Sequence, residues 1–226
     1  MSISENGIVK ASPDLTDVEK MMIRDAGTTL HYSKGHNIFS AGEISDRIYL
    51  IENGYVKIYR LSTDGKRVTV GSMRSPGELM GLAETLLGLE RACFAGAISN
   101  ASLVVLHINK FEELLAKQPI LGIKISKLLA ARMRDAEGLI HEMVAWQTPG
   151  RLALMLLKMG ERAGKETKGG IQINLPLTHE EIASMIGASR QTVTSLLNTF
   201  KKEKSIMLEN RNIVITDPDK LSTWLT

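Results

Sequence analysis

The sequence predicts an α+β chain with three successive parts: an N-terminal β-roll, one long helix and a C-terminal winged helix-turn-helix. Short alternating strands separated by glycine turns run through "RIYLIENGYVKIYRLSTDGKRVTVGSM" at residues 47–73. One helical pattern then continues over residues 120–147. Finally, "LTHEEIASMIGASRQTVTSLLNTFKK" at residues 177–202 has two helical patterns on either side of Gly-Ala-Ser. We therefore expect domains at residues 1–117, 118–147 and 148–226.

Composition limits the class of protein. The 226 residues are enough for one large domain or two modest ones, and the net charge of +3 is mild. Lysine and arginine recur between Arg190 and Arg211, so the basic excess is local. The single cysteine, Cys93, excludes a disulfide framework within one chain and suits a reducing cytoplasm. The polar N-terminus lacks the apolar core of a signal peptide, and no apolar run could span a bilayer, so we expect a cytoplasmic protein without a membrane partner.

The first part has the turn signals of an all-β roll or barrel. Thr16 and Glu19 stand at capping-box spacing and predict a short helix over residues 16–26. Asn53-Gly54 and Asp64-Gly65 are two-residue hairpin signals between short strands. A helical stretch interrupts the strands at residues 76–91, a further strand follows at residues 102–108, and a short helix precedes Pro119.

The long helix has apolar residues at spacings of 4, 3, 4 and 3. Such a heptad seam favours a helix that pairs with its own copy, and the alternative is a helix that packs on its own domain. The residues of the predicted dimer interface are Leu129, Met133, Ala136, Ile140 and Met143. Thr148 can cap a helix and Pro149 suits a first helical turn, so a new helix is expected to begin here.

The start and stop signals of a helix-turn-helix lie between residues 177 and 202. Thr178 and Glu181 form a capping box, so the first helix is expected to begin at Thr178. Gly187 suits the left-handed conformation that ends a helix, and Ser189 can cap the next one. The strand pair "IMLENRNIVITD" at residues 206–217 follows as a wing around residues 210–212. Without the wing, two surface helices with a polar face would explain the pattern equally well.

The second of these helices has two different faces. Val193, Leu196, Leu197 and Phe200 share the apolar face, and the opposite face suits the major groove, where arginine reads guanine and glutamine reads adenine. The predicted DNA-binding residues are Ser189, Arg190, Gln191, Thr194, Ser195, Asn198, Lys201 and Arg211. The expected partner is therefore a double-stranded DNA operator.

The order of roll, long helix, "LTHEEIASMIGASRQTVTSLLNTFKK" and wing resembles the cyclic-AMP receptor protein/FNR (Crp/Fnr) superfamily of bacterial transcription regulators. The resemblance covers nearly the whole chain. It implies a cyclic-nucleotide-binding-type roll that responds to an effector, a homodimer on a twofold-symmetric operator, and RNA polymerase as a further partner. Gln191 stands where the family's commonest pattern has an acid, and Ser195 where it has an arginine. The operator core is therefore expected to differ from the usual family site.

The segment "PGELMGLAETLLGLERACFAGA" resembles the family's phosphate-binding cassette. The resemblance implies that Glu78 binds a ribose hydroxyl and that Arg91 pairs with a cyclic phosphate. Thirteen positions separate these two residues, which is longer than in the family cassette. No certain cofactor follows: a cyclic nucleotide, another small anionic effector and a structural ion pair between Glu78 and Arg91 stay open. The predicted effector-binding residues are Gly77, Glu78, Leu79, Arg91, Ala92 and, on the long helix, Arg132.

Two positions on the long helix count against a cyclic nucleotide. Ala136 and Glu137 fall where the cyclic-AMP-binding relative has a Thr-Ser pair that contacts the adenine. By contrast, Arg132 falls at a phosphate-proximal arginine of that relative. Within the cassette, Cys93 is either a small buried hydrophobic residue or a redox thiol whose pKa the neighbouring Arg91 lowers.

The alternative class of function is a metal- or small-molecule-dependent cupin-like β-barrel enzyme with an accessory helical domain. Such a barrel needs clustered histidines and carboxylates, and only His31 and His36 are close in sequence. We therefore predict no enzyme, no catalytic residue and no metal site. A single axial histidine for haem is left open, and His179 is expected to contact the DNA backbone or to be solvated. The five histidines, which show no metal-ligand spacing, are His31, His36, His107, His141 and His179.

Overall fold

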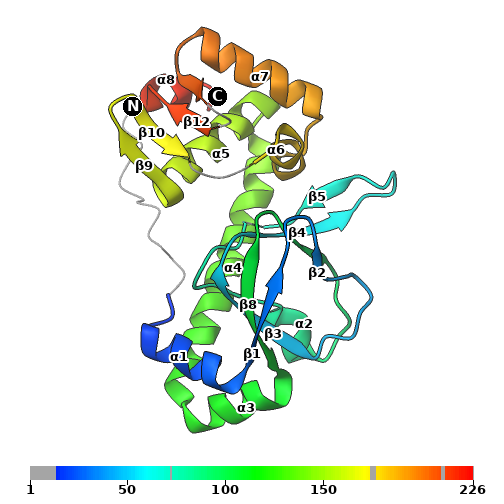
Figure 1. Cartoon of the computed structure of the whole chain (residues 1–226). Coiled ribbons are helices and arrows are strands. Elements are labelled where there is room, and N and C mark those ends of the chain that lie inside the picture. Colours follow the sequence, from blue (N-terminus) through cyan, green and yellow to red (C-terminus); the bar gives the residue numbers. More distant parts are fainter. Residues whose placement is uncertain (1–13, 72, 174–176, 210–211, 226) are drawn as a thin grey trace. The chain divides into compact units, whose positions relative to one another are not determined.

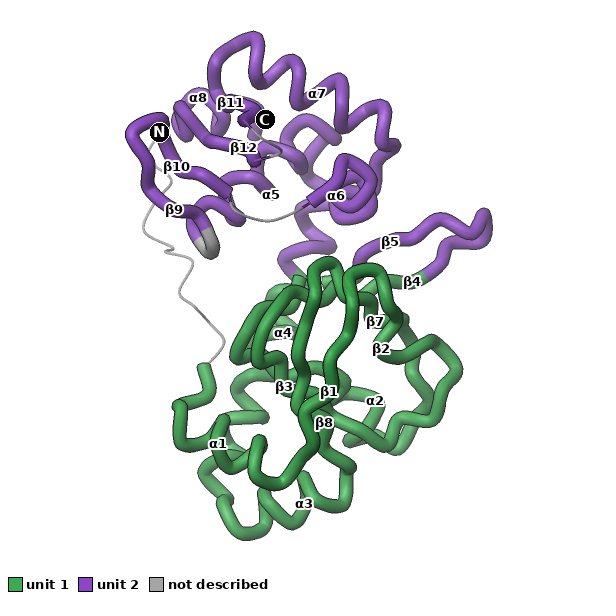
Figure 2. The backbone as a smooth tube through the Cα atoms, in the orientation of Figure 1, with its two compact units in different colours: residues 1–60, 70–137 green, residues 61–69, 138–226 purple. Residues whose placement is uncertain are grey.

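The computed structural model describes residues 14–71, 73–173, 177–209 and 212–225. The chain divides into two compact units, which Figure 2 shows in different colours. The first unit holds residues 1–60 and 70–137, and the second holds residues 61–69 and 138–226. In the described parts of the chain, a search for a helix with the length and hydropathy of a membrane span finds none.

Two four-stranded sheets form the β-roll (Figure 1). One has the order β1-β8-β3-β6, and the other has the order β2-β7-β4-β5. Strand β8 runs antiparallel to both β1 and β3, and β7 runs antiparallel to both β2 and β4. The strands are β1 (Thr28–Tyr32), β2 (Asn37–Phe39), β3 (Arg47–Asn53), β4 (Val56–Leu61), β5 (Arg67–Thr69), β6 (Leu79–Met80), β7 (Phe94–Ala97) and β8 (Ala101–His107).

The two predicted hairpin turns differ in the structure. Asp64-Gly65 does lie in the connection between the neighbouring strands β4 and β5, where Ser62 N donates to Lys66 O at 2.9 Å. The hairpin prediction for Asn53-Gly54 is wrong, because this turn joins β3 of one sheet to β4 of the other. Gly54 has φ +83°, and a Cβ there would lie 2.3 Å from Asn100 O. Close backbone packing at a sheet crossing therefore explains this glycine.

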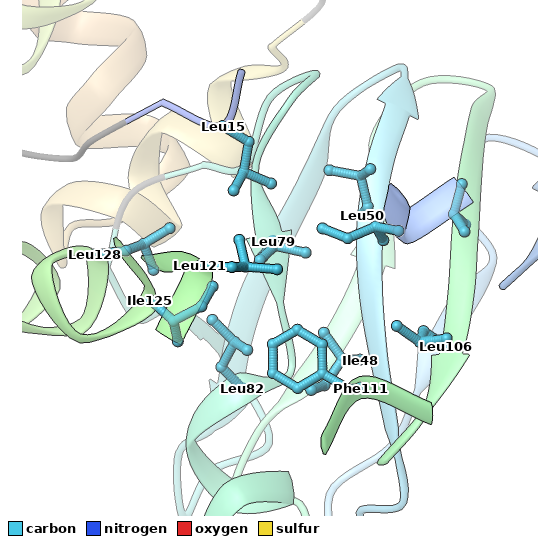
Figure 3. Packing of buried hydrophobic residues seen from close by; sticks show 12 residues of the cluster. Leu15, Ile48, Leu50, Leu79, Leu82, Leu106, Phe111, Leu121, Ile125 and Leu128 are labelled. Carbon is cyan, nitrogen blue, oxygen red and sulfur yellow. The ribbon is translucent and has the colours of Figure 1, made fainter. Parts of the chain in front are cut away.

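Helices cover the roll and share its main apolar core. The predicted capping box of α1 is confirmed: Thr16 N donates to Glu19 Oε2 at 2.6 Å, and Glu19 N donates to Thr16 Oγ1 at 3.3 Å. Figure 3 shows Leu121 and Ile125 of the long helix α4 in the same cluster as Phe111 of α3. The helices of this part are α1 (Asp17–Ala26), α2 (Leu82–Leu87), α3 (Ile108–Lys117) and α4 (Pro119–Ala145).

The first half of the long helix α4 packs against the β-roll. Leu121, Ile125, Leu128 and Ala131 are all buried there. Beyond them, Met133 and Ile140 are 61% and 66% exposed. The first half of the helix therefore packs on its own domain, whereas its second half has an apolar strip that this single chain leaves uncovered.

The second unit is a helix-turn-helix with a four-stranded sheet in the order β11-β12-β10-β9. The wing strands β11 and β12 are confirmed, but the predicted tip residues Asn210 and Arg211 lie outside the described residues. Thr148 does not cap α5; it is the first helical residue, and the N-cap is Gln147. The elements are α5 (Thr148–Ala163), β9 (Gly164–Thr167), β10 (Gly170–Ile173), α6 (His179–Ile186), α7 (Arg190–Lys202), β11 (Ile206–Glu209), β12 (Asn212–Ile215) and α8 (Pro218–Ser222).

Candidate functional site

Local hydrogen bonds define both helices of the helix-turn-helix, as predicted. Thr178 N donates to Glu181 Oε2 at 2.8 Å, and Glu181 N donates to Thr178 Oγ1 at 3.2 Å. Gly187 ends α6 in the left-handed conformation, with φ +64° and ψ +47°. Ser189 then caps α7, because its Oγ accepts from Thr192 N at 3.0 Å. These bonds set where each helix begins and ends.

Burial fixes the rotation of α7 about its own axis. Val193, Leu197 and Phe200 are completely buried, and Leu196 is partly exposed. The Phe200 ring lies 5.3 Å from the ring of Trp224, measured between centroids. The Trp224 indole also donates to Glu203 Oε1 at 2.8 Å, which fastens the C-terminal segment to the end of α7. The sequence did not predict this anchor.

The face of α7 opposite the buried one carries the predicted DNA contacts. Arg190, Gln191 and Ser195 are exposed in its first two turns. Asn198 and Lys201 continue this exposed face toward the C-terminus. The structure therefore gathers most of the predicted reading residues on one surface. Arg211 cannot be placed with them, because it lies outside the described residues.

Two of the predicted DNA-binding residues, Ser189 and Thr194, form hydrogen bonds within the protein. Ser189 is occupied as the helix cap and also shares a hydrogen bond with Thr192 Oγ1 at 2.8 Å. Thr194 is half-buried, and its hydroxyl donates to Arg190 O at 2.9 Å. The same hydroxyl lies 2.8 Å from Nδ1 of His179, the first residue of α6. Sequence reasoning missed this side-chain link between the two helices, because periodicity does not pair residues fifteen positions apart.

In the first unit, the turn before β6 holds the carboxylate of Glu78. Its Oε2 accepts from Ser75 N at 2.6 Å and from Ser75 Oγ at 2.9 Å. Its other oxygen, Oε1, lies 3.8 Å from Arg74 Nη1. Gly77 has φ +89°, and a Cβ there would lie 3.4 Å from Lys20 Cε. A glycine turn, one carboxylate and nearby cations therefore meet here.

Arg132 of α4 reaches the same turn. Its Nη2 donates to Leu79 O. Burial first, and then the like charge of Arg74, lower the pKa of Arg132 to about 10, while Glu78 and Asp135 oppose the shift. The structure thus brings Glu78, Leu79 and Arg132 together. The guanidinium groups of Arg74 and Arg132 thus lie near the carboxylates of Glu78 and Asp135, and charged N–H donors of this kind can also bind an anion.

The side chain of Arg91 does not bond to the turn of Glu78. It is only 3% exposed, its Nη1 donates to Gly81 O at 2.9 Å, and its Nη2 donates to Arg47 O. Its guanidinium carbon lies 4.4 Å from the ring centroid of Phe39, close enough for a cation–π contact. Burial lowers the pKa of Arg91, although the charges around it oppose the shift. Arg91 is therefore already bonded to two carbonyl groups and is largely shielded from an anion in solution.

The structure decides one alternative for the cassette, the ion pair between Glu78 and Arg91. Among the described residues, neither a hydrogen bond nor an ion pair joins Glu78 to Arg91, so the alternative of a structural pair between them is wrong. Ala92 is exposed next to the buried Arg91. The cassette residues thus divide between the turn of Glu78 and a separate, buried arrangement around Arg91.

The predicted dimer seam is mostly uncovered in the single chain. Met133, Ala136 and Ile140 are exposed, whereas Leu129 packs partly on the core of the roll. Met143 is 37% exposed. Val144 is 85% exposed and is absent from the predicted seam, although it lies four positions after Ile140 on the same side of the helix.

Comparison with known proteins decides the family. Residues 29–118 match the cyclic nucleotide-binding domain profile, and residues 150–224 match the Crp-like helix-turn-helix domain profile. The chain is 30% identical over 191 residues to the CRP-like cAMP-activated global transcriptional regulator of Mycobacterium tuberculosis, covering 84% of this chain and 85% of that protein. The chain belongs to the Crp/Fnr superfamily of transcription regulators.

Further relatives agree with this assignment. The chain is 30% identical over 193 residues to the global nitrogen regulator of Synechococcus elongatus, covering 84% of this chain and 86% of that protein. The structure of FixK2 from Bradyrhizobium japonicum has the same fold, with a TM-score of 0.77, 24% identity and coverage of 88% and 96% of the two chains. The relatives of this Crp/Fnr protein are regulators, so the cupin-like enzyme alternative is not supported.

Cys93 of this Crp/Fnr protein is half-buried in the roll. The expectation that Arg91 lowers its pKa is wrong. Burial raises the pKa of the Cys93 thiol, the charge of Glu84 raises it further, and the cation that opposes the shift is Arg60. A raised pKa disfavours the reactive thiolate, which agrees with a packing role rather than a redox role.

Two histidines of this Crp/Fnr protein have identifiable surroundings. His107 accepts from Asn109 N at 3.3 Å and caps α3, and His31 lines a shallow depression of about 360 Å³ together with Tyr32 and Asn100. Within the ranges that the structure describes, His, Cys, Asp and Glu form no group of three that could hold a metal ion. The depression contains none of the predicted effector residues.

The buried arrangement of Arg91 gives a prediction about stability without any effector. Arg91→Met should lower the free energy of unfolding of the roll by about 2–4 kcal/mol, because two carbonyl groups lose a charged donor. Urea unfolding followed by tyrosine fluorescence measures this, since all four tyrosines lie in the first unit and both tryptophans in the second. The matched control is Arg47→Met, whose side chain is 57% exposed and should matter by less than about 1 kcal/mol. Equal losses in the two variants would contradict the structural role.

Proposed function

We propose that this Crp/Fnr protein is a homodimer that binds an inverted-repeat operator through residues 189–201 and responds to a small effector in its β-roll. The observation that carries this proposal is the two-faced helix α7. Val193, Leu197 and Phe200 on one side of this helix are completely buried. On the other side, Arg190, Gln191 and Ser195 are exposed near the start of the helix. Residues at the start of a recognition helix are those that meet base edges in the major groove.

The residues of α7 divide into two proposed roles. Arg190 would donate two hydrogen bonds to a guanine, and Gln191 would pair with an adenine. Lys201, near the other end of the helix, would contact a phosphate, and we assign the same role to Arg211. Gln191 in place of the family's usual acid supports an operator whose core differs from the common family site.

The proposed dimer rests on the exposed strip of α4. Met133, Ile140 and Val144 recur at intervals of seven and four positions on one side of the helix. Large apolar side chains at this spacing pack between two helices in a coiled coil. Two copies joined along α4 would present two recognition helices about a twofold axis, which is why the operator should be an inverted repeat.

The proposed effector is a small anion beside the Glu78 turn and Arg132. The guanidinium groups of Arg132 and Arg74 support an anion, and the glycine turn offers backbone close to a ligand. Cyclic AMP is one candidate, because a relative is named as cAMP-activated. In this proposal Arg91 has a structural role, because it holds the carbonyl of Gly81 at the end of β6 that lies away from the Glu78 turn. RNA polymerase is the further partner we propose, with the cytoplasm as the place of action.

Selection from random duplexes tests the DNA interface. It should return an inverted repeat with half-site centres about 34–36 Å apart. Arg190→Ala and Gln191→Ala should each weaken binding by about 1–3 kcal/mol and relax preference at one base pair per half-site. The control Lys201→Ala should weaken all sequences evenly and flatten the salt dependence. If the common family site returns unchanged, Gln191 does not read a base.

Light scattering tests the dimer, which should have twice the 24.9 kDa mass of one chain. Ile140→Asp should give monomers at micromolar concentration, because two carboxylates would face each other in an apolar seam. Val144→Asp should act in the same direction. Ala145→Asp, one position off the strip, is the matched control and should stay dimeric. A monomeric wild-type protein would contradict the proposal.

Calorimetry with cyclic AMP and cyclic GMP tests the effector site. If either binds, Arg132→Ala should weaken it by about 1.5–3 kcal/mol, the scale of a charged hydrogen bond. Arg134→Ala, exposed two positions later on the same helix, should leave the affinity unchanged. No heat and no thermal shift with either nucleotide would exclude both as effectors and direct the search to other small anions.

A further inference from the structure

The side-chain link between the two helices of the helix-turn-helix has a chemical consequence for DNA binding. His179 is the first residue of α6, and its Nδ1 lies 2.8 Å from Oγ1 of Thr194 on α7. The same Oγ1 donates to Arg190 O at 2.9 Å. Both side chains are half-buried, so this small network lies at the edge of the exposed face of α7.

The contacts of Thr194 Oγ1 with Nδ1 and with Arg190 O can both be hydrogen bonds in only one tautomer of neutral His179. A threonine hydroxyl has one hydrogen, and Thr194 gives it to the carbonyl of Arg190. The contact between Oγ1 and Nδ1 therefore needs a hydrogen on Nδ1, which donates to the hydroxyl oxygen. In the neutral imidazole one nitrogen carries the hydrogen and the other is an acceptor. Neutral His179 consequently has a lone pair, and not an N–H group, at Nε2.

The remaining nitrogen is the one that can meet DNA. In a helix-turn-helix, the first helix crosses the phosphate backbone while the second enters the major groove. Phosphate oxygens only accept hydrogen bonds, so a lone pair at Nε2 is repelled and an N–H group is required. With Nδ1 already protonated, Nε2 gains a hydrogen only when the ring becomes the imidazolium cation.

We propose that His179 binds a DNA phosphate through Nε2 only as the imidazolium, and that operator binding by this protein therefore takes up a proton. Thr194 is then a positioning residue, which sets the tautomer rather than reading a base. This inference rests on the proposed DNA-binding function and adds to it a dependence on pH. The bound complex holds the extra proton, so affinity is highest at acidic pH and falls as the pH rises through neutrality.

The other charged side chains around the pair are carboxylates and a guanidinium group. Glu180 is the exposed neighbour of His179 on α6, the carboxylate of Glu181 accepts from Thr178, and Arg190 lies one turn before Thr194 on α7. Carboxylates and guanidinium groups ordinarily keep their charge between about pH 6 and pH 8, whereas histidine is the side chain that titrates there. A change in DNA affinity over this range therefore reports an imidazole.

The experiment measures the dissociation constant of the full-length protein for the selected inverted repeat between about pH 6 and pH 8, at constant ionic strength. Affinity of the wild-type protein should fall by roughly tenfold, the scale of one charged hydrogen bond. His179→Gln should remove most of this dependence, and His179→Arg, which stays charged, should bind tightly and without it. His36→Gln, at an exposed histidine of the roll, is the control and should keep the wild-type dependence.

Thr194→Val isolates the role of the tautomer. Valine keeps the shape of threonine but removes the hydroxyl, so neutral His179 can place its hydrogen on Nε2 and bind phosphate without proton uptake. The pH dependence should then shrink although His179 is still present. Because the slope of affinity with pH is compared, any direct effect of Thr194 on base reading, which is the same at every pH, does not alter the result.

Three outcomes would overturn the inference: a wild-type affinity that is constant with pH, an unchanged dependence in His179→Gln, or a full dependence in Thr194→Val. Each of these leaves the proposed DNA-binding function intact. Failure of that function has a different signature, namely that selection recovers no inverted repeat at any pH.

Discussion

Burial of one side of α7 is the constraint on which the DNA-binding unit depends. Val193, Leu197 and Phe200 are completely enclosed, so the helix cannot rotate without exposing them to water. The polar residues between them consequently point outward in a fixed order. Because the start of α7 is capped by Ser189 and its end is fastened by Trp224, the exposed face is also fixed along its length. A regulator that reads base edges needs both restraints, since hydrogen bonds to bases tolerate little displacement.

In the β-roll, two arginine side chains restrain the backbone around β6. Arg91 and Arg132 both donate to backbone carbonyl groups around β6, at Gly81 and Leu79 respectively. Arg91 is enclosed by the roll and joins the carbonyl groups of Gly81 and Arg47, whereas Arg132 comes from α4 and meets the charges of Arg74 and Glu78. An effector bound beside Arg132 would therefore act directly on the long helix. In the proposed dimer that helix also forms the interface, which gives effector binding a physical route to the paired recognition helices.

Much of the fold could be predicted because its signals are local. The capping boxes at Thr16 and Thr178 and the left-handed Gly187 each depend on residues within three or four positions, and all are present. The errors arose where a local signal has two structural meanings. Asn53-Gly54 turns the chain in either setting, but only the pairing of β3 with β8 and of β4 with β7 shows that it crosses between sheets. The strand β9 has no alternating apolar pattern, because its residues are exposed, and the short strand β10 offers only Ile171 and Ile173 on alternate positions.

The sequence by itself determined where the helices of the helix-turn-helix begin and end, and which side of α7 is apolar, because helical geometry relates residues three and four positions apart. Only the tertiary structure decided which candidate side chains act together. It separated Arg91 from Glu78, placed Arg132 against Leu79, and paired His179 with Thr194. Such contacts join residues far apart in the chain, and their partners depend on how whole elements pack. The spacing of residues along the sequence therefore cannot predict these contacts.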